Sequence, residues 1–122
     1  MKNYKTDALK YDLVSLINLQ NKRIENIRLF EASIDNEKKA IFQEDVIQTN
    51  LETKLNKHNN GLSVLDKTAY HLIQIDLPKI KSTKEKRNQT ISLLRNAIFE
   101  EQNNIDYESK MIDFLRSNGS KD

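Results

Sequence analysis

Hydrophobic residues recur at helical spacing along most of the chain, and the longest such pattern covers residues 90–117. Its apolar positions fall three, four or seven residues apart, which places them on one side of a helix; they are Leu94, Ile98, Ile105, Ile112 and Leu115. Glu101 and Glu108 share that side, so the packed face of this helix carries two carboxylates. We expect the other segments to pack against this helix.

Two helices are predicted in the first half of the chain. The first begins near Thr6 or Asp7, either of which can cap it, and ends at about Ile34, before a short break at residues 35–36. The second covers residues 37–57 and is closed by the Asn-Asn-Gly sequence at residues 59–61, because Asn and Gly tolerate the left-handed backbone conformation.

A shorter helix is predicted between these two and the last one. It begins near Ser63 or Asp66 and kinks or stops at Pro78, which lacks a backbone donor and disfavours the helical conformation of the preceding residue. Ser82 or Thr83 can then cap the last helix. Because the connections are short, sequential helices are expected to be antiparallel.

Composition supports a single helical domain over residues 1–122. Only 2 Gly and 1 Pro leave too few chain breakers for the many turns of a β-sandwich or barrel. The predicted fold class is therefore all-α: an antiparallel up-and-down helical bundle with three long helices and one shorter, kinked helix.

Charge and cysteine content exclude several classes of partner and chemistry. The 20 Lys and Arg residues against 18 Asp and Glu residues give a net charge of +2, too small for the one-sided field of a nucleic-acid-binding protein. The basic run at residues 79–87 is predicted to be a solvated helix junction. No apolar run approaches the roughly 20 residues that span a bilayer, so no membrane partner is expected. The absence of Cys excludes disulfides and thiolate sites and agrees with a cytoplasmic location.

Several acidic and imidazole side chains lie on the predicted packed faces and are candidate metal ligands: Glu44, Asp76, His58 and Glu101. Counting from the turns pairs His58 with Glu101, and Glu44 with Asp76, with Arg28 opposite the second pair. A di-iron site in a helical bundle needs two Glu-x-x-His motifs, and neither His58 nor His71 has a Glu three residues earlier. Ion pairs with Arg23 or Arg28 are therefore preferred, and no cofactor is expected, with iron or zinc the candidates if a metal binds.

Four short stretches resemble a family of bacterial ferritin-like four-helix proteins, the domain-of-unknown-function family 2383. They are residues 13–25 (similar to LxxLIxxNNxRIE), Lys39-Ala40-Ile41-Phe42, residues 70–77 and Phe99-Glu100-Glu101. The chain departs from the family pattern at Glu100, where the family has Gly, at Gln74, where it has Trp, and in lacking the final helix. The resemblance implies a ferritin-like bundle whose missing contacts come from a second copy of the chain.

The last helix extends beyond the shorter one, so part of its apolar stripe is expected to lack a cover within the chain and to form a protein interface: Ile105, Met111, Ile112, Phe114 and Leu115. A homo-oligomer is preferred over a foreign partner helix. With no nucleophile motif or phosphate loop, we predict a non-enzymatic structural or interaction role. Two alternatives stay open: an export chaperone of the flagellar type, which residues such as Glu37, Ala40 and Leu51 resemble, and a degenerate di-metal oxidoreductase.

Overall fold

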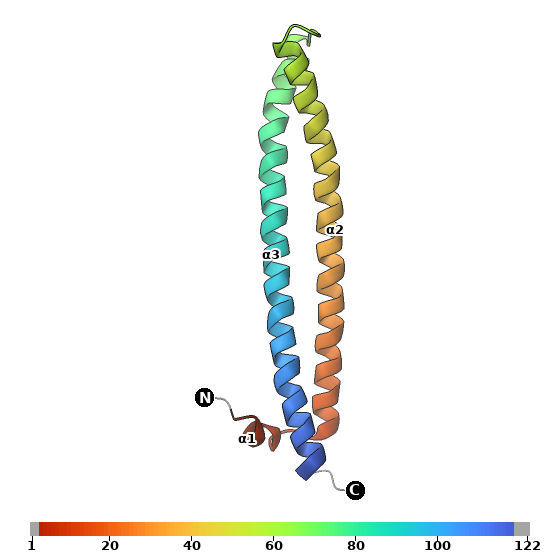
Figure 1. Ribbon diagram of the computed structural model, residues 1–122, viewed down its shortest axis with the longest axis vertical. Coiled ribbons are helices and arrows are strands. Elements are labelled where there is room, and N and C mark those ends of the chain that lie inside the picture. Colours follow the sequence, from red (N-terminus) through yellow and green to blue (C-terminus); the bar gives the residue numbers. More distant parts are fainter. Residues whose placement is uncertain (1–2, 119–122) are drawn as a thin grey trace. The chain divides into compact units, whose positions relative to one another are not determined.

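The computed structural model describes residues 3–118, which form three helices (Figure 1): α1 (Tyr4–Ala8), α2 (Leu13–Asn59) and α3 (Lys67–Asn118). No strand occurs in this range, so the all-α prediction is confirmed. None of the helices in the described part of the chain has the length and apolar character needed to cross a membrane. The chain divides into two compact units: unit 1 is Met1–Ser33 with Leu93–Asp122, and unit 2 is Ile34–Ser92.

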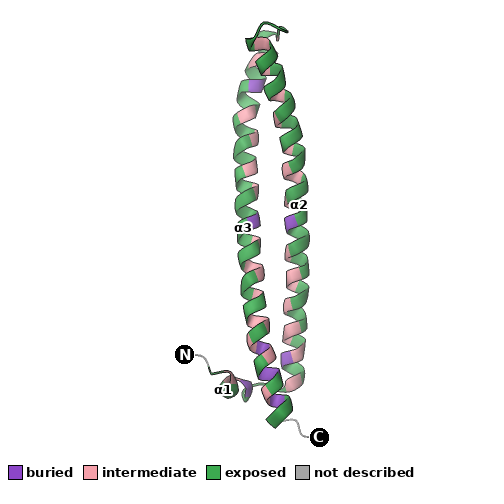
Figure 2. Ribbon diagram, viewed as in Figure 1, coloured by how far each residue is buried: buried purple, intermediate pink, exposed green. Residues whose placement is uncertain are grey.

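Both long helices place their least exposed positions at alternating steps of three and four residues, the heptad spacing of coiled coils. In α2 these positions are Leu13, Leu16, Gln20, Arg23, Ile27, Phe30, Ile34, Glu37, Ile41, Glu44, Gln48, Leu51, Leu55 and His58. In α3 they are Tyr70, Ile73, Leu77, Ile80, Lys84, Arg87, Ile91, Leu94, Ile98, Glu101, Ile105, Glu108, Ile112 and Leu115. Within each unit this set, here called the seam, lies where α2 and α3 face each other (Figure 2).

The predicted number of helices is wrong, because α2 and α3 continue through both of the predicted interruptions. Asp35 and Asn36 are exposed, and their modest helix propensity is outweighed by the seam residues on either side, Ile34 and Glu37. Pro78 lies inside α3 at another exposed position. Its cost, about 3 kcal/mol in a helix interior, is tolerated because the 3-4 spacing of the seam is kept across it.

The start of the chain also differs from the prediction of one helix from residue 6 or 7. Asn3 caps the short α1 by accepting hydrogen bonds from the backbone of Lys5 (3.0 Å) and Thr6 (3.4 Å). Asp12 begins α2, since its side chain accepts a 2.6 Å bond from the backbone of Ser15. That bond lowers the pKa of the Asp12 carboxyl below its usual value. Two good caps close together therefore separate the predicted first helix into α1 and α2.

The predicted boundary at residues 59–61 is confirmed. Gly61 adopts a left-handed conformation with φ of 72°, and two backbone bonds close α2: Gly61 N–H to His58 C=O (3.1 Å) and Leu62 N–H to Lys57 C=O (2.8 Å). This pair of bonds is a Schellman motif, which commonly ends a helix at Gly. Asp66, one of the two expected caps, then starts α3 by accepting a 2.7 Å bond from the backbone of Ala69.

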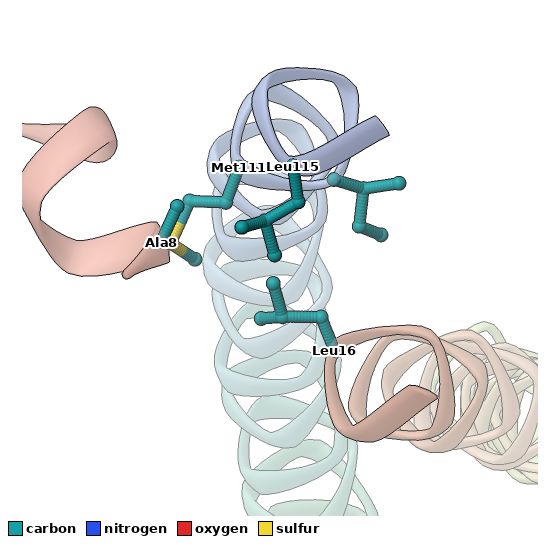
Figure 3. Close-up of a cluster of buried hydrophobic side chains, with 5 residues drawn as sticks. Ala8, Leu16, Met111 and Leu115 are labelled. Carbon is teal, nitrogen blue, oxygen red and sulfur yellow. The ribbon is translucent and has the colours of Figure 1, made fainter. Parts of the chain in front are cut away.

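The hydrophobic core of unit 1 forms where α1 packs on the two long helices. Ala8 of α1 and Leu16 of α2 have 0% exposure, and Met111, Ile112 and Leu115 of α3 are exposed by 8% or less. Figure 3 shows Ala8, Leu16, Met111 and Leu115 directed toward one another from all three helices. In unit 2 the buried hydrophobic residues are Ile34, Ile73 and Ile91, which occupy separate positions along the seam.

Replacing Leu16 with Ala is expected to lower the free energy of unfolding by about 2–5 kcal/mol, because the lost methyl groups leave a cavity in this core. Chemical denaturation followed by circular dichroism measures the loss. Val14→Ala on the same helix is the control: Val14 is 67% exposed, so its change should stay within about 0.5 kcal/mol. Equal losses for the two variants would contradict the placement of Leu16 in the core.

Candidate functional site

The polar residues of the seam in unit 1 are paired across the two helices. Arg23 of α2 donates from Nε to Glu108 Oε2 (2.7 Å) and from Nη1 to Glu101 Oε1 (3.1 Å), both on α3. Asn26 donates to the second oxygen of Glu101 at 3.3 Å. Glu108 is only 2% exposed. A single guanidinium therefore holds two carboxylates that the helix pair encloses.

One turn before Arg23, an amide makes a further polar connection between the same helices. Gln20 Nε2 donates to the backbone carbonyl of Ile105 (3.1 Å) and lies 2.8 Å from Ser109 Oγ. Positions on α2 rise as their partners on α3 fall, so these segments of unit 1 are antiparallel, as predicted for neighbouring helices. The unusual presence of Gln on a packed face is thus explained by a partner on the other helix.

Unit 2 contains a second group of one arginine and two glutamates. Here the arginine lies on α3 and the two glutamates lie on α2. Arg87 of α3 donates from Nε to Glu44 Oε1 (2.8 Å) and from Nη1 to Glu37 Oε2 (3.2 Å), both on α2. Beside it, Lys84 pairs with Asp45 and donates to Gln48 Oε1 at 2.8 Å. These bonds again run antiparallel between the two helices.

The two layers, Arg23 with Glu101 and Glu108 and Arg87 with Glu37 and Glu44, share one chemical design. Each places one guanidinium between two carboxylates seven residues apart. Burial lowers the pKa of Arg23, but the bonds and charges of its two Glu partners outweigh this and raise the pKa above its ordinary value. The bonds to Glu44 and Glu37 likewise raise the pKa of Arg87. Both arginines therefore stay charged, as the pairing requires.

Each layer has two carboxylates and one guanidinium, and therefore one excess negative charge. As a result, one buried carboxylate oxygen in each layer has no hydrogen-bond donor among the residues that the structure describes. Glu108 Oε1 and Glu44 Oε2 are buried and accept no hydrogen bond from a described residue. Because a buried ion pair needs good geometry and further bonds to offset its desolvation, these layers are poor sources of net stability. They are better suited to fixing which residues of α2 face which residues of α3.

Three of the four candidate metal ligands are held in other contacts, and the fourth, Asp76, is exposed on α3. Glu101 and Glu44 belong to the arginine layers. His58 accepts a 3.1 Å bond at Nδ1 from the backbone of Leu65, and its ring lies 5.1 Å from that of Tyr70. Over residues 3–118, no three His, Cys, Asp or Glu side chains come close enough to share a metal ion.

The expected arginine partners are half correct. Arg23 pairs with one of the candidate acids, Glu101, whereas Arg28, which was expected opposite Glu44 and Asp76, pairs with Glu25 on its own helix at 2.6 and 3.0 Å. The partner of Glu44 is Arg87, which belongs to the basic run predicted to be a solvated helix junction. That assignment of residues 79–87 is wrong, because they lie inside α3 and Lys84 and Arg87 occupy seam positions. The 3-4 spacing of the seam is the signal that identifies them.

The residues expected to form an uncovered stripe are largely covered within unit 1. Met111, Ile112 and Leu115 are buried in the core with Ala8 and Leu16, and Phe114 packs against that core. Ile105 is half-buried in the seam. The expectation of a missing cover fails because residues 3–12, which include α1, fold back over the end of α3; the ring of Tyr4 meets that of Phe114 edge-on at 6.5 Å.

A cavity of about 290 Å³ in unit 1 is lined by residues of all three helices, among them Asp7, Arg23, Tyr107 and Glu108. The Tyr107 hydroxyl donates to Asp7 Oδ2, which ties α1 to α3. Because ionisation of Tyr107 would remove that donor beside a carboxylate, the bond to Asp7 raises the pKa of Tyr107 to about 12. The cavity therefore presents a phenol that stays protonated over the physiological pH range.

The chain matches no protein-family model, no curated protein and no solved structure with which it was compared. The resemblance to the ferritin-like family of unknown function therefore stays a prediction.

Replacing Arg23 with Met is expected to lower the free energy of unfolding by about 3 kcal/mol at neutral pH. This is the low end for a broken buried pair, since the Arg23 side chain is 23% exposed, and the loss arises because Glu108 is left buried without a cation. Denaturant titration measures it. Arg28→Met is the matched control: its side chain is 67% exposed, so little change is expected. Equal effects would contradict a special role for the Arg23 layer.

The Tyr107–Asp7 bond predicts an alkaline transition that can be followed by phenolate absorbance. The folded pKa of Tyr107, about 12, lies above the ordinary value of 10.0; the bond therefore contributes stability below pH 10 and loses it as the pH rises through about 12. Tyr107→Phe should remove this transition, and Asp7→Ala should move it toward lower pH, whereas Tyr70→Phe in unit 2 should retain it. A transition that Asp7→Ala leaves in place would show that Asp7 does not control Tyr107.

Proposed function

We propose that this chain is a non-enzymatic structural or interaction protein of the cytoplasm that pairs with a second copy of itself. In the pair, α2 and α3 of one copy lie against the same helices of the other, which gives the four-helix, ferritin-like arrangement that the sequence resemblance implies. The absence of cysteine supports the cytoplasmic part of the proposal.

The observation that carries the proposal is the apolar surface of unit 2. Two antiparallel helices bury only the sides that face each other, so hydrophobic residues elsewhere on them stay in water. Large apolar side chains are exposed on α2 and on α3: Phe42 by 69%, Val46 by 47%, Ile47 by 50%, Leu72 by 51% and Ile75 by 38%. Phe42 and Val46 are one turn apart and share a side of α2. Exposed apolar groups on a unit that buries so few hydrophobic residues favour a further layer of helices.

A second copy fits this surface better than a foreign helix for two reasons. A symmetric pair brings the same exposed residues of both copies together, which doubles the apolar area available to the contact. The net charge of +2 on 122 residues sets up little repulsion between two copies. A client helix, as an export chaperone would bind, is the alternative occupant of the same surface.

The chemistry of the seam supports a role without catalysis. Glu101 has both oxygens bonded to side chains of α2, and His58 Nδ1 is occupied by a backbone N–H. A general acid or base has to reach its substrate with a free proton donor or acceptor. The arginine layers use their charged groups to join helices instead. Binding of iron or zinc would require ligands from a second copy beside those described.

Light scattering and sedimentation test the pairing directly. The unmodified chain is expected to have twice the mass of one copy at micromolar concentration, and Phe42→Gln should weaken the dimer by at least about tenfold, because a buried aromatic residue contributes strongly to an interface. Leu9→Gln is the matched control, since Leu9 is 72% exposed and lies outside the helices. Far-UV circular dichroism should be the same for all three proteins.

A monomer for the unmodified chain at every concentration would overturn the proposal and favour a client helix as the occupant. A dimer that Phe42→Gln leaves unchanged would show that the copies meet elsewhere.

A further inference from the structure

The loop between α2 and α3, at residues 60–66 of unit 2, presents two aliphatic side chains to water. Val64 is 88% exposed and Leu62 is 76% exposed, more than the other large hydrophobic residues that the structure describes as exposed. Leu62 lies between Gly61 and Ser63, and Val64 lies between Ser63 and Leu65, so the segment places one large apolar neighbour, the half-buried Leu65, beside them. Exposed aliphatic groups of this extent call for an explanation other than packing.

This loop is held by hydrogen bonds, so its exposed residues are not the consequence of a loose segment. The backbone N–H groups of Leu62 and Ser63 both bond to the carbonyl of Lys57, at 2.8 and 3.2 Å. Leu65 donates its N–H to His58 Nδ1 at 3.1 Å and is itself half-buried. The hydrogen bonds that turn Leu65 toward the helices leave Leu62 and Val64 exposed on either side of Ser63. Little conformational entropy would be lost when this loop meets a partner.

The charges next to the loop are mainly positive. Residues 53–67 contain three lysines, Lys54, Lys57 and Lys67, and one acid, Asp66, which leaves +2 with His58 neutral. The lysines are exposed, and none is ion-paired with another residue in the described range. The carboxylate of Asp66 is bonded to the backbone at the start of α3. Cations therefore flank the aliphatic pair on both helices.

We propose that this loop is a docking point for an anionic lipid surface, with Leu62 and Val64 entering the interface and the three lysines contacting lipid headgroups. Peripheral attachment of this kind needs two signals, an apolar insertion and an electrostatic attraction, and the loop carries both. A flat anionic surface can meet Lys57 of α2 and Lys67 of α3 at the same time.

Other occupants fit the loop less well. A second copy would bring the same +2 charge against this one. Nucleic acid is usually held by arginine and by aromatic stacking, and the aromatic ring near the loop, Tyr70, is half-buried against His58. The expectation of no membrane partner rests on the lack of a spanning segment, and contact with one lipid leaflet requires none. The proposal is independent of self-association.

The test uses sedimentation of the full chain with sucrose-loaded vesicles, made either of phosphatidylcholine alone or of phosphatidylcholine and phosphatidylserine in equal parts. Binding is expected only with phosphatidylserine. The double variant Leu62→Ser/Val64→Ser and the double variant Lys57→Glu/Lys67→Glu should each weaken it by at least about tenfold. The control Leu9→Ser/Leu93→Ser alters residues that are 72% and 69% exposed elsewhere and should bind as the unmodified chain does.

A second readout uses the absence of tryptophan from the chain. Leu62→Trp should show a blue-shifted emission when phosphatidylserine vesicles are added, and Leu93→Trp should show none. No sedimentation with anionic vesicles, binding that the loop variants leave unchanged, or an unshifted Leu62→Trp emission would each overturn the proposal.

Discussion

The bonds from Arg23 and Arg87 to pairs of glutamates are the constraint on which this structure depends. Coiled-coil helices with uniformly apolar seams can slide by whole heptads at little cost, because every layer resembles the next. Here a slide of α3 along α2 by one heptad would leave Arg23 with one carboxylate instead of two. In one direction Glu108 would face Leu16, and in the other Glu101 would face Phe30. An unpaired buried carboxylate costs several kcal/mol, so the two layers penalise the alternative registers and act together with the short hydrogen-bonded loop that joins the helices.

Because the arginine layers occupy seam positions that apolar residues could fill, the described chain buries few apolar residues. Unit 1 gains its core from α1, which adds Ala8 and the ring of Tyr4 to the end of the helix pair. Unit 2 has three buried hydrophobic residues, and its Arg87 layer, with Lys84 and Asp45 beside it, supplies orientation more than stability. The apolar side chains that the seam does not use remain on the outer sides of the helices and on the loop. These are the surfaces through which we propose that the protein interacts.

Helical periodicity, the Gly61 turn and the cap at Asp66 were predictable because each is a local property of the sequence. The helix breaks were not, since Asp35, Asn36 and Pro78 are unfavourable residues whose cost is overridden by packing along an unbroken seam. Arg23 could be named as a possible partner for a buried acid, but its pairing with Glu101 and Glu108 could not be derived, because the predicted stripe of the first helix contains Ile24 in place of Arg23. Arg87 was missed because a basic run around a proline was interpreted as a junction; following the 3-4 spacing through it would have placed Arg87 opposite Glu37 and Glu44. The cover of Met111 and Leu115 depends on a long-range contact with α1, which no local pattern reveals.

A double-mutant cycle between Arg23 and Glu108 tests this view of the seam most directly. The free energy of unfolding is measured at neutral pH for the unmodified chain, Arg23→Met, Glu108→Gln and the double variant, with helicity followed throughout. The layer predicts a coupling of at least about 1 kcal/mol, so that the double variant is more stable than the sum of the single losses allows. Single losses that add to within about 0.5 kcal/mol would show that the two groups are not energetically linked and would contradict the account.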